Sequence, residues 1–123
     1  MNRRRVVIAD DHPRALVALR ALLTTAPDIE VVGTAASGAE ALRLIAAHRP
    51  EVVVVEVELP DVRGLAVIQT VRARWPTVRV VAVSLFAGHR RPALAAGAHA
   101  FFAKDDPPAQ LLDAVLSDTV DAP

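Results

Sequence analysis

The side chains best suited to chemistry are carboxylates, a hydroxyl and an amine, each at the end of a predicted strand. They are Asp10, Asp11, Glu56, Ser84 and Lys104. Three carboxylates close together repel one another, which raises the pKa of at least one unless a cation balances them. Lys104 or an oxygen-preferring divalent cation such as Mg2+ could supply that charge. A metal, an amine and a hydroxyl around one central carboxylate are the equipment for phosphoryl transfer to that carboxylate.

The aspartate pair also has a simpler explanation. Adjacent aspartates are common where a strand ends in a turn, so Asp10 and Asp11 alone are equally consistent with a cap and with a metal site. The histidines add little to this picture. His12 is expected to support the start of the next helix rather than to bind metal, and His48 and His99 are expected on the surface.

The hydrophobic pattern predicts the elements that must bring these groups together. Residues 52–55 are an unbroken run of valines, which is typical of a strand buried on both faces of a sheet. Similar apolar runs alternate with helical segments, which indicates a parallel sheet covered by helices. Strands are predicted at 5–9, 29–35, 52–56, 78–84 and 100–103, and helices at 13–25, 38–49, 64–75 and 108–116, with a short one from Pro92.

One capping motif supports these boundaries. Ser37 and Glu40 match a capping box, in which the serine accepts a hydrogen bond from the third helical amide and the glutamate reaches back. Asp106, Pro107 and Pro108 are expected to cap the last helix.

Right-handed crossovers place all strand carboxyl ends at one edge of such a sheet, where ligands bind. Loops far apart in the sequence should therefore deliver the reactive side chains to one rim.

Composition excludes several classes of protein. The 123 residues suit one domain, and no apolar run reaches the roughly 18 residues of a membrane span. The first apolar run stops at Asp10, short of a signal peptide's roughly 7–15-residue core. There is no cysteine for a disulfide or a thiolate metal site, and 14 basic residues balance 14 acidic ones, which argues against a nucleic-acid-binding surface. A cytoplasmic location is expected.

In combination, the motifs of this chain resemble the receiver domain of bacterial two-component response regulators, in particular the LuxR/NarL-type branch. They are Val-Val-Ile-Ala-Asp-Asp-His-Pro at 6–13, Arg-Pro-Glu-Val-Val at 49–53, Leu-Pro at 59–60 with Gly64, Ala-Ala-Gly-Ala at 95–98 and Phe-Ala-Lys-Asp at 102–105. The resemblance covers about residues 4–116, so we expect a receiver domain at 1–117 and a tail or the start of a linker at 118–123. It implies a flavodoxin-like (βα)5 doubly wound parallel sheet with strand order 2-1-3-4-5.

The resemblance also implies roles for individual residues. It makes Asp10 and Asp11 metal ligands together with Glu56 and the backbone carbonyl of Glu58, Ser84 the switch hydroxyl, Phe101 the switch aromatic, and Lys104 the phosphoryl-binding lysine. The implied cofactor is Mg2+. The implied partners are a helix-turn-helix DNA-binding output domain, a histidine kinase and a second copy of the chain through the first and last helices.

Glu56 departs from the family, whose phosphoacceptor is an aspartate. The extra methylene moves the carboxylate about 1.5 Å outward, and a misplacement of about 1 Å can cost on the order of a hundredfold in rate. We therefore predict an atypical receiver that ordinary aspartyl phosphorylation does not regulate, with Mg2+ binding weak or absent. Glu56 could reach Lys104 or Ser84 and favour an active-like state, although its charge of about −1 only partly mimics a phosphoryl group. Simple loss of phosphorylation is the alternative.

The segment after Ser84 is a second departure. Gly88 and Pro92 predict a mobile loop and then a fourth helix of one or two turns that begins near Pro92. His89, Arg90 and Arg91 there form either an anion-binding or partner-contacting patch or simply a solvated basic loop.

Two other functions fit the same sheet. A ligand-sensing pseudo-receiver would respond to a small molecule in place of a phosphoryl group. A metal-dependent phosphohydrolase commonly needs a second aspartate two residues after the first, and His12 stands at that position here. We therefore expect a non-enzymatic signalling domain that controls transcription through an output domain outside this chain.

Overall fold

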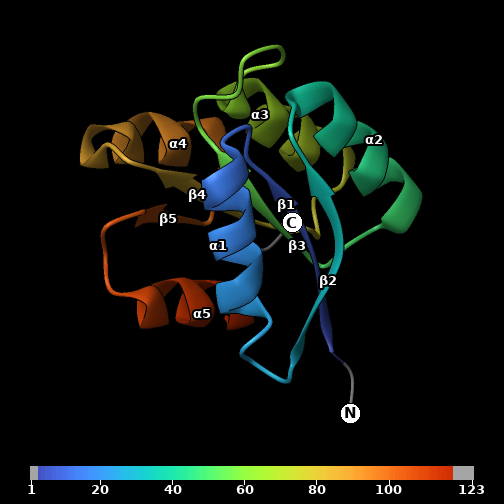
Figure 1. Ribbon diagram of the computed structural model, residues 1–123. Helices are drawn as coiled ribbons and strands as arrows, with labels where there is room; N and C mark the ends of the chain where they lie inside the picture. The colour runs from blue at the N-terminus through green and yellow to red at the C-terminus, as the bar shows by residue number, and fades with distance from the viewer. Residues whose placement is uncertain (1–2, 118–123) are drawn as a thin grey trace.

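The structure, a computed structural model, describes residues 3–117, so the predicted tail at 118–123 lies outside the described residues. Strands and helices alternate along the chain (Figure 1). The strands are β1 (Arg4–Ala9), β2 (Ile29–Ala35), β3 (Val52–Glu56), β4 (Arg79–Ser84) and β5 (Ala100–Ala103). The helices are α1 (Pro13–Leu23), α2 (Gly38–His48), α3 (Gly64–Arg74), the 3-10 turn η1 (Ala87–His89), α4 (Arg90–Ala96) and α5 (Pro108–Leu116). Within this described part, every helix is too short to cross a membrane.

The five strands form one parallel sheet in the order β2-β1-β3-β4-β5, which confirms the predicted fold. All five residues of the central strand β3 are buried. Val53 and Val55 join an apolar cluster beneath α2, α3 and α4, whereas Val52 and Val54 join a second cluster beneath α1 and α5. Helices thus cover both faces of the sheet (Figure 1). This explains why the strands are continuously apolar instead of alternating.

The predicted capping box starts α2. Ser37 Oγ accepts a hydrogen bond from the Glu40 amide at 3.2 Å. The Glu40 carboxylate accepts at 2.9 Å from the amide of Ala36, one residue earlier than in the expected reciprocal bond. Both bonds satisfy backbone amides at the start of the helix.

The fourth helix is short, as predicted, with seven residues. It begins at Arg90, because Pro92 falls within the first turn, where a backbone N–H has no partner inside the helix. The preceding residues form η1, and the mobility of this segment stays a prediction. Gly97 ends the helix with a φ of 118°, in the left-handed region that favours glycine.

Two expectations about polar residues need correction. His99 is half-buried rather than on the surface, because its Nδ1 accepts a hydrogen bond from the Val80 amide at 3.0 Å. His48 is exposed, as expected. Asp106 does not cap α5, since its carboxylate instead accepts from the Ala103 amide at 3.1 Å.

The loop between β3 and α3 is fixed at both ends. Asp61 accepts hydrogen bonds from the Gly38 and Ala39 amides at 2.8 and 3.1 Å, which attaches the loop to the start of α2. These backbone bonds lower the pKa of the Asp61 carboxyl. At the other end, the Gly64 amide donates to the Val57 carbonyl at 3.1 Å. The loop therefore holds the carboxyl end of β3 in a defined position.

Gly64 gives a test of this packing. A Cβ at Gly64 would lie 2.0 Å from the Glu56 carbonyl oxygen and 2.7 Å from Val57 Cα, whereas a Cβ at Gly88 meets nothing within 4 Å. Because backbone atoms block the first site, Gly64→Ala should lower the free energy of unfolding by about 1–3 kcal/mol. Gly88→Ala, the matched control, should change it by less than about 0.5 kcal/mol. Equal effects in urea titrations would contradict the close contact.

Candidate functional site

The candidate site is centred on Lys104, which lies between two buried carboxylates. Lys104 Nζ is 2.7 Å from Asp10 Oδ2 and 2.5 Å from Glu56 Oε1. The Asp10 side chain is fully buried and that of Glu56 is 3% exposed. The Lys104 side chain is only 11% exposed, and it is the single lysine of the sequence. The structure therefore places these three predicted site residues in direct contact.

Each of these residues reaches the site from the carboxyl end of a strand. Asp10 follows β1, Glu56 is the last residue of β3, and Lys104 follows β5. The Lys104 amide donates to the Ser84 carbonyl at 2.8 Å, which fixes the start of the lysine beside β4. β5 lies two strands from β3, or about 10 Å. Two long side chains, a lysine and a glutamate, are thus able to meet across β4.

The two carboxylates determine the charge of Lys104. Burial lowers the pKa of Lys104, but the hydrogen bonds to Asp10 and Glu56 and their negative charge outweigh this and raise the pKa above its usual value. The amine is therefore a permanent cation at neutral pH. It balances part of the repulsion between the carboxylates without a metal ion.

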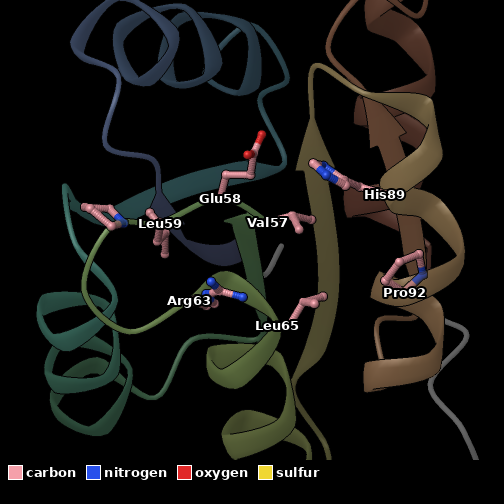
Figure 2. A pocket seen from close by; sticks show the side chains of 8 residues that line it. Val57, Glu58, Leu59, Arg63, Leu65, His89 and Pro92 are labelled. Carbon is pink, nitrogen blue, oxygen red and sulfur yellow. The ribbon is translucent and has the colours of Figure 1, made fainter.

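The second oxygen of each carboxylate, Asp10 and Glu56, also has a partner. Glu56 Oε2 accepts a hydrogen bond from the Glu58 amide at 3.0 Å. Asp10 Oδ1 accepts from the His12 amide at 2.9 Å. Each carboxylate oxygen of Asp10 and Glu56 therefore has a hydrogen-bond or ion-pair partner. The Glu58 side chain itself is exposed, as expected, and it extends away from Arg63 in Figure 2.

His12 lies at the site, which the sequence argument did not anticipate. Its carbonyl accepts from the Leu16 amide, so its backbone starts α1, but its side chain does not cap the helix. The ring Nδ1 instead lies 3.3 Å from both Asp10 Oδ1 and Asp11 Oδ1. The adjacency of His12 to two aspartates was the signal that could have found this contact.

Asp11 and its neighbours fit a divalent cation in part. Asp11 Oδ1 is buried and, apart from its 3.3 Å contact with the His12 ring, has no hydrogen-bond partner among residues 3–117. Ligand atoms of Asp10, His12 and Glu56 all lie within 4.8 Å of one another. This donor set of carboxylate oxygens and one imidazole suits a divalent metal. Lys104 already contacts two of its oxygens, however, so a metal would have to share or displace the amine.

Ser84 and Phe101 lie further from the centre of the site. The buried Ser84 hydroxyl is 2.7 Å from His89 Nδ1 and accepts from the Phe86 amide at 3.1 Å. These partners precede α4, so the hydroxyl links β4 to that helix, and no bond to Glu56 is found in the described part of the chain. Phe101 is half-buried against the cluster beneath α2, α3 and α4, whereas Phe102 is buried in the cluster beneath α1 and α5.

Comparisons with known proteins show the family of this chain. The response regulator receiver domain family matches residues 6–116. The uncharacterized transcriptional regulatory protein YhcZ of Bacillus subtilis is 37% identical over 110 residues, which is 88% of this chain and 51% of that protein. The nitrate/nitrite response regulator protein NarL of Escherichia coli is 30% identical over 113 residues, which is 89% of this chain and 52% of that protein. The chain spans about half the length of these curated relatives.

Solved structures share the same fold. The signal receiver domain of NarL from Mycobacterium tuberculosis superposes with a TM-score of 0.88 at 34% identity, covering 94% of this chain and 95% of that one. The response regulator domain of CheB from Thermotoga maritima gives a TM-score of 0.84 at 27% identity, covering 93% and 94%. With a matching family, a shared strand order and carboxylates gathered at the same sheet edge, this chain belongs to the receiver domains of response regulators.

Proposed function

We propose that this receiver domain signals without aspartyl phosphorylation, and that Lys104 together with Glu56 replaces the phosphorylated site. The contact of Lys104 with both Asp10 and Glu56 carries this proposal. A phosphoacceptor must present a free oxygen in line with the donor. Glu56 is one methylene longer than the usual aspartate, and both of its oxygens are engaged.

The same contacts support loss of phosphorylation over a complete active-like state. Glu56 offers Lys104 a negative charge, as a phosphoryl group would, but it carries only about −1 where phosphate carries about −1.5 to −2. Ser84 takes no part in this exchange, since its hydroxyl is bonded to His89. Glu56 therefore replaces the phosphoryl group in its contact with Lys104, but it makes no contact with the predicted switch hydroxyl of Ser84.

A divalent cation has a reduced role in this arrangement. Asp10, Asp11, Glu56 and the Glu58 carbonyl are the residues that would hold Mg2+, and a bound ion would neutralise negative charge there. Because Lys104 already supplies one positive charge to Asp10 and Glu56, the electrostatic gain from a second cation is smaller than it would be without the amine. Mg2+ should therefore bind weakly.

The domain's partners follow from its relatives, which are transcriptional regulators of about twice this length. The proposed output is transcription control in the cytoplasm through a DNA-binding domain outside the sequence given, with any histidine kinase unable to switch Glu56. Val17 on α1 and Leu116 on α5 are exposed apolar residues suited to a homodimer contact. A phosphohydrolase is not supported, because His12 rather than an aspartate stands two residues after Asp10.

Phosphorylation can be tested by intact mass. Incubation with acetyl phosphate and Mg2+ should leave the wild-type mass unchanged, because Glu56 offers no free, well-placed oxygen. Glu56→Asp restores the shorter side chain and should gain a labile adduct of about 80 Da. A stable adduct on Glu56 of the wild type would contradict the proposal, and an inert Glu56→Asp would show that more than the methylene has been lost.

Metal binding tests the role of Lys104. Lys104→Met removes the internal cation and leaves the two carboxylates unbalanced, so Mg2+ should bind at least about tenfold more tightly. Arg43→Met, which removes one positive charge from the exposed face of α2, is the matched control and should leave the affinity unchanged. Isothermal titration calorimetry measures both. Equal Mg2+ affinity in Lys104→Met and wild type would argue against competition between amine and metal.

A further inference from the structure

A cavity of about 460 Å3 separates the loop after β3 from the start of α4. Its lining residues are Val57, Glu58, Leu59, Pro60, Arg63, Leu65, His89 and Pro92. Figure 2 shows His89 and Pro92 on one wall and Val57 and Leu65 on the other. Volumes of about 300–1,000 Å3 are typical of sites for small organic molecules. Glu56 and Lys104 are not among the lining residues, although Glu58 is, so the cavity lies beside the carboxylate site.

Five of the eight lining residues are apolar. Val57 and Leu59 are buried, Leu65 is half-buried, and Pro60 and Pro92 complete the surface. A ligand that fills this space would cover apolar area, which is favourable at roughly 25 cal/mol per Å2. The cavity therefore offers apolar contacts for the body of a ligand beside its polar groups.

The cavity is lined by one arginine, Arg63, and one glutamate, Glu58. Arg63 is exposed, and its guanidinium has no ion pair or side-chain hydrogen bond among residues 3–117. Glu58, the only acidic lining residue, extends away from Arg63 (Figure 2). Arg90 and Arg91 directly follow His89 and are exposed as well, so they add positive charge beside that wall. An anion would complement this field.

We propose that this cavity binds an organic carboxylate with an aromatic or aliphatic body. The planar guanidinium of Arg63 matches a carboxylate through two parallel hydrogen bonds. The body of the ligand would lie against Val57, Leu65 and Pro92. This site goes beyond the proposed function and does not depend on it, because neither Glu56 nor Lys104 contributes to it.

His89 connects the cavity to the receiver's switch region. Its ring lines the cavity while its Nδ1 lies 2.7 Å from Ser84 Oγ. The same ring packs edge-on against Phe86, with ring centroids 5.5 Å apart. The His89 ring can either hold the Ser84 hydroxyl or turn away from it. A ligand that contacts this ring would bind the two arrangements with different affinity, and so would shift the balance between them. Ligand binding would thereby change the contact between Ser84 and His89, and with it the position of the start of α4, without phosphorylation.

The proposal is tested by NMR titration with indole-3-acetate, and with octanoate as a second probe for an aliphatic body. Amide signals of Gly64, Leu65, Phe86 and His89 should shift saturably with at least one probe. Indole-3-acetamide and octanamide, the neutral counterparts, should bind about tenfold more weakly, which corresponds to roughly 1.4 kcal/mol for the lost charge-assisted bonds.

Variants separate the cavity from non-specific binding. Arg63→Gln should weaken binding of the responsive acid about tenfold, whereas Arg20→Gln on the exposed face of α1 should bind it like wild type. Three results would each overturn the site: no saturable shift with either acid, equal binding of acid and amide, or shifts confined to the exposed side chains of Leu85 and Leu94. None of these results would alter the phosphorylation experiment, so the two proposals fail independently.

Discussion

The ion pairs of one lysine with two buried carboxylates dominate the chemistry of this receiver domain. A carboxylate without a partner in a buried position costs several kcal/mol. Asp10 and Glu56 avoid this cost by sharing the ammonium of Lys104. All other basic residues of the chain, apart from histidines, are arginines. A lysine provides a compact charge on a flexible stem, which suits a narrow site at the edge of a sheet.

The fold was largely predictable because its signals are local. Continuous apolar strands require helices on both faces, and this fixed the parallel sheet and the edge where the strand ends meet. Pro92 predicted a short fourth helix, and Ser37 predicted the start of the second. Each of these signals acts within a few residues along the chain, so no knowledge of distant contacts was required.

The details of the site were less predictable, because they depend on where side chains turn after the strands end. The sequence indicated that Lys104 could reach Glu56, and strand order was sufficient for that contact. It did not indicate that His12 faces the aspartates or that His89 holds the Ser84 hydroxyl. An imidazole can turn toward solvent or toward a carboxylate at similar cost, and only the packed loops decide between the two.

Two separate features therefore lie at the carboxyl edge of the sheet. The Lys104 contacts stabilise one arrangement of β1, β3 and β5 without an added phosphoryl group. The bond between Ser84 and His89 connects β4 with the start of α4, beside the cavity. Under the proposed function, such a domain keeps the receiver architecture, while the state of α4 no longer depends on phosphorylation of residue 56.

The pKa of Lys104 tests the central contact most directly, and as the single lysine its side-chain signal is readily assigned by NMR. The ion pairs predict a pKa above that of a free lysine in the wild type, and a lower value in Glu56→Gln, where one of the two carboxylates becomes neutral. An identical Lys104 pKa in both proteins would show that the amine does not contact Glu56, and would contradict this account.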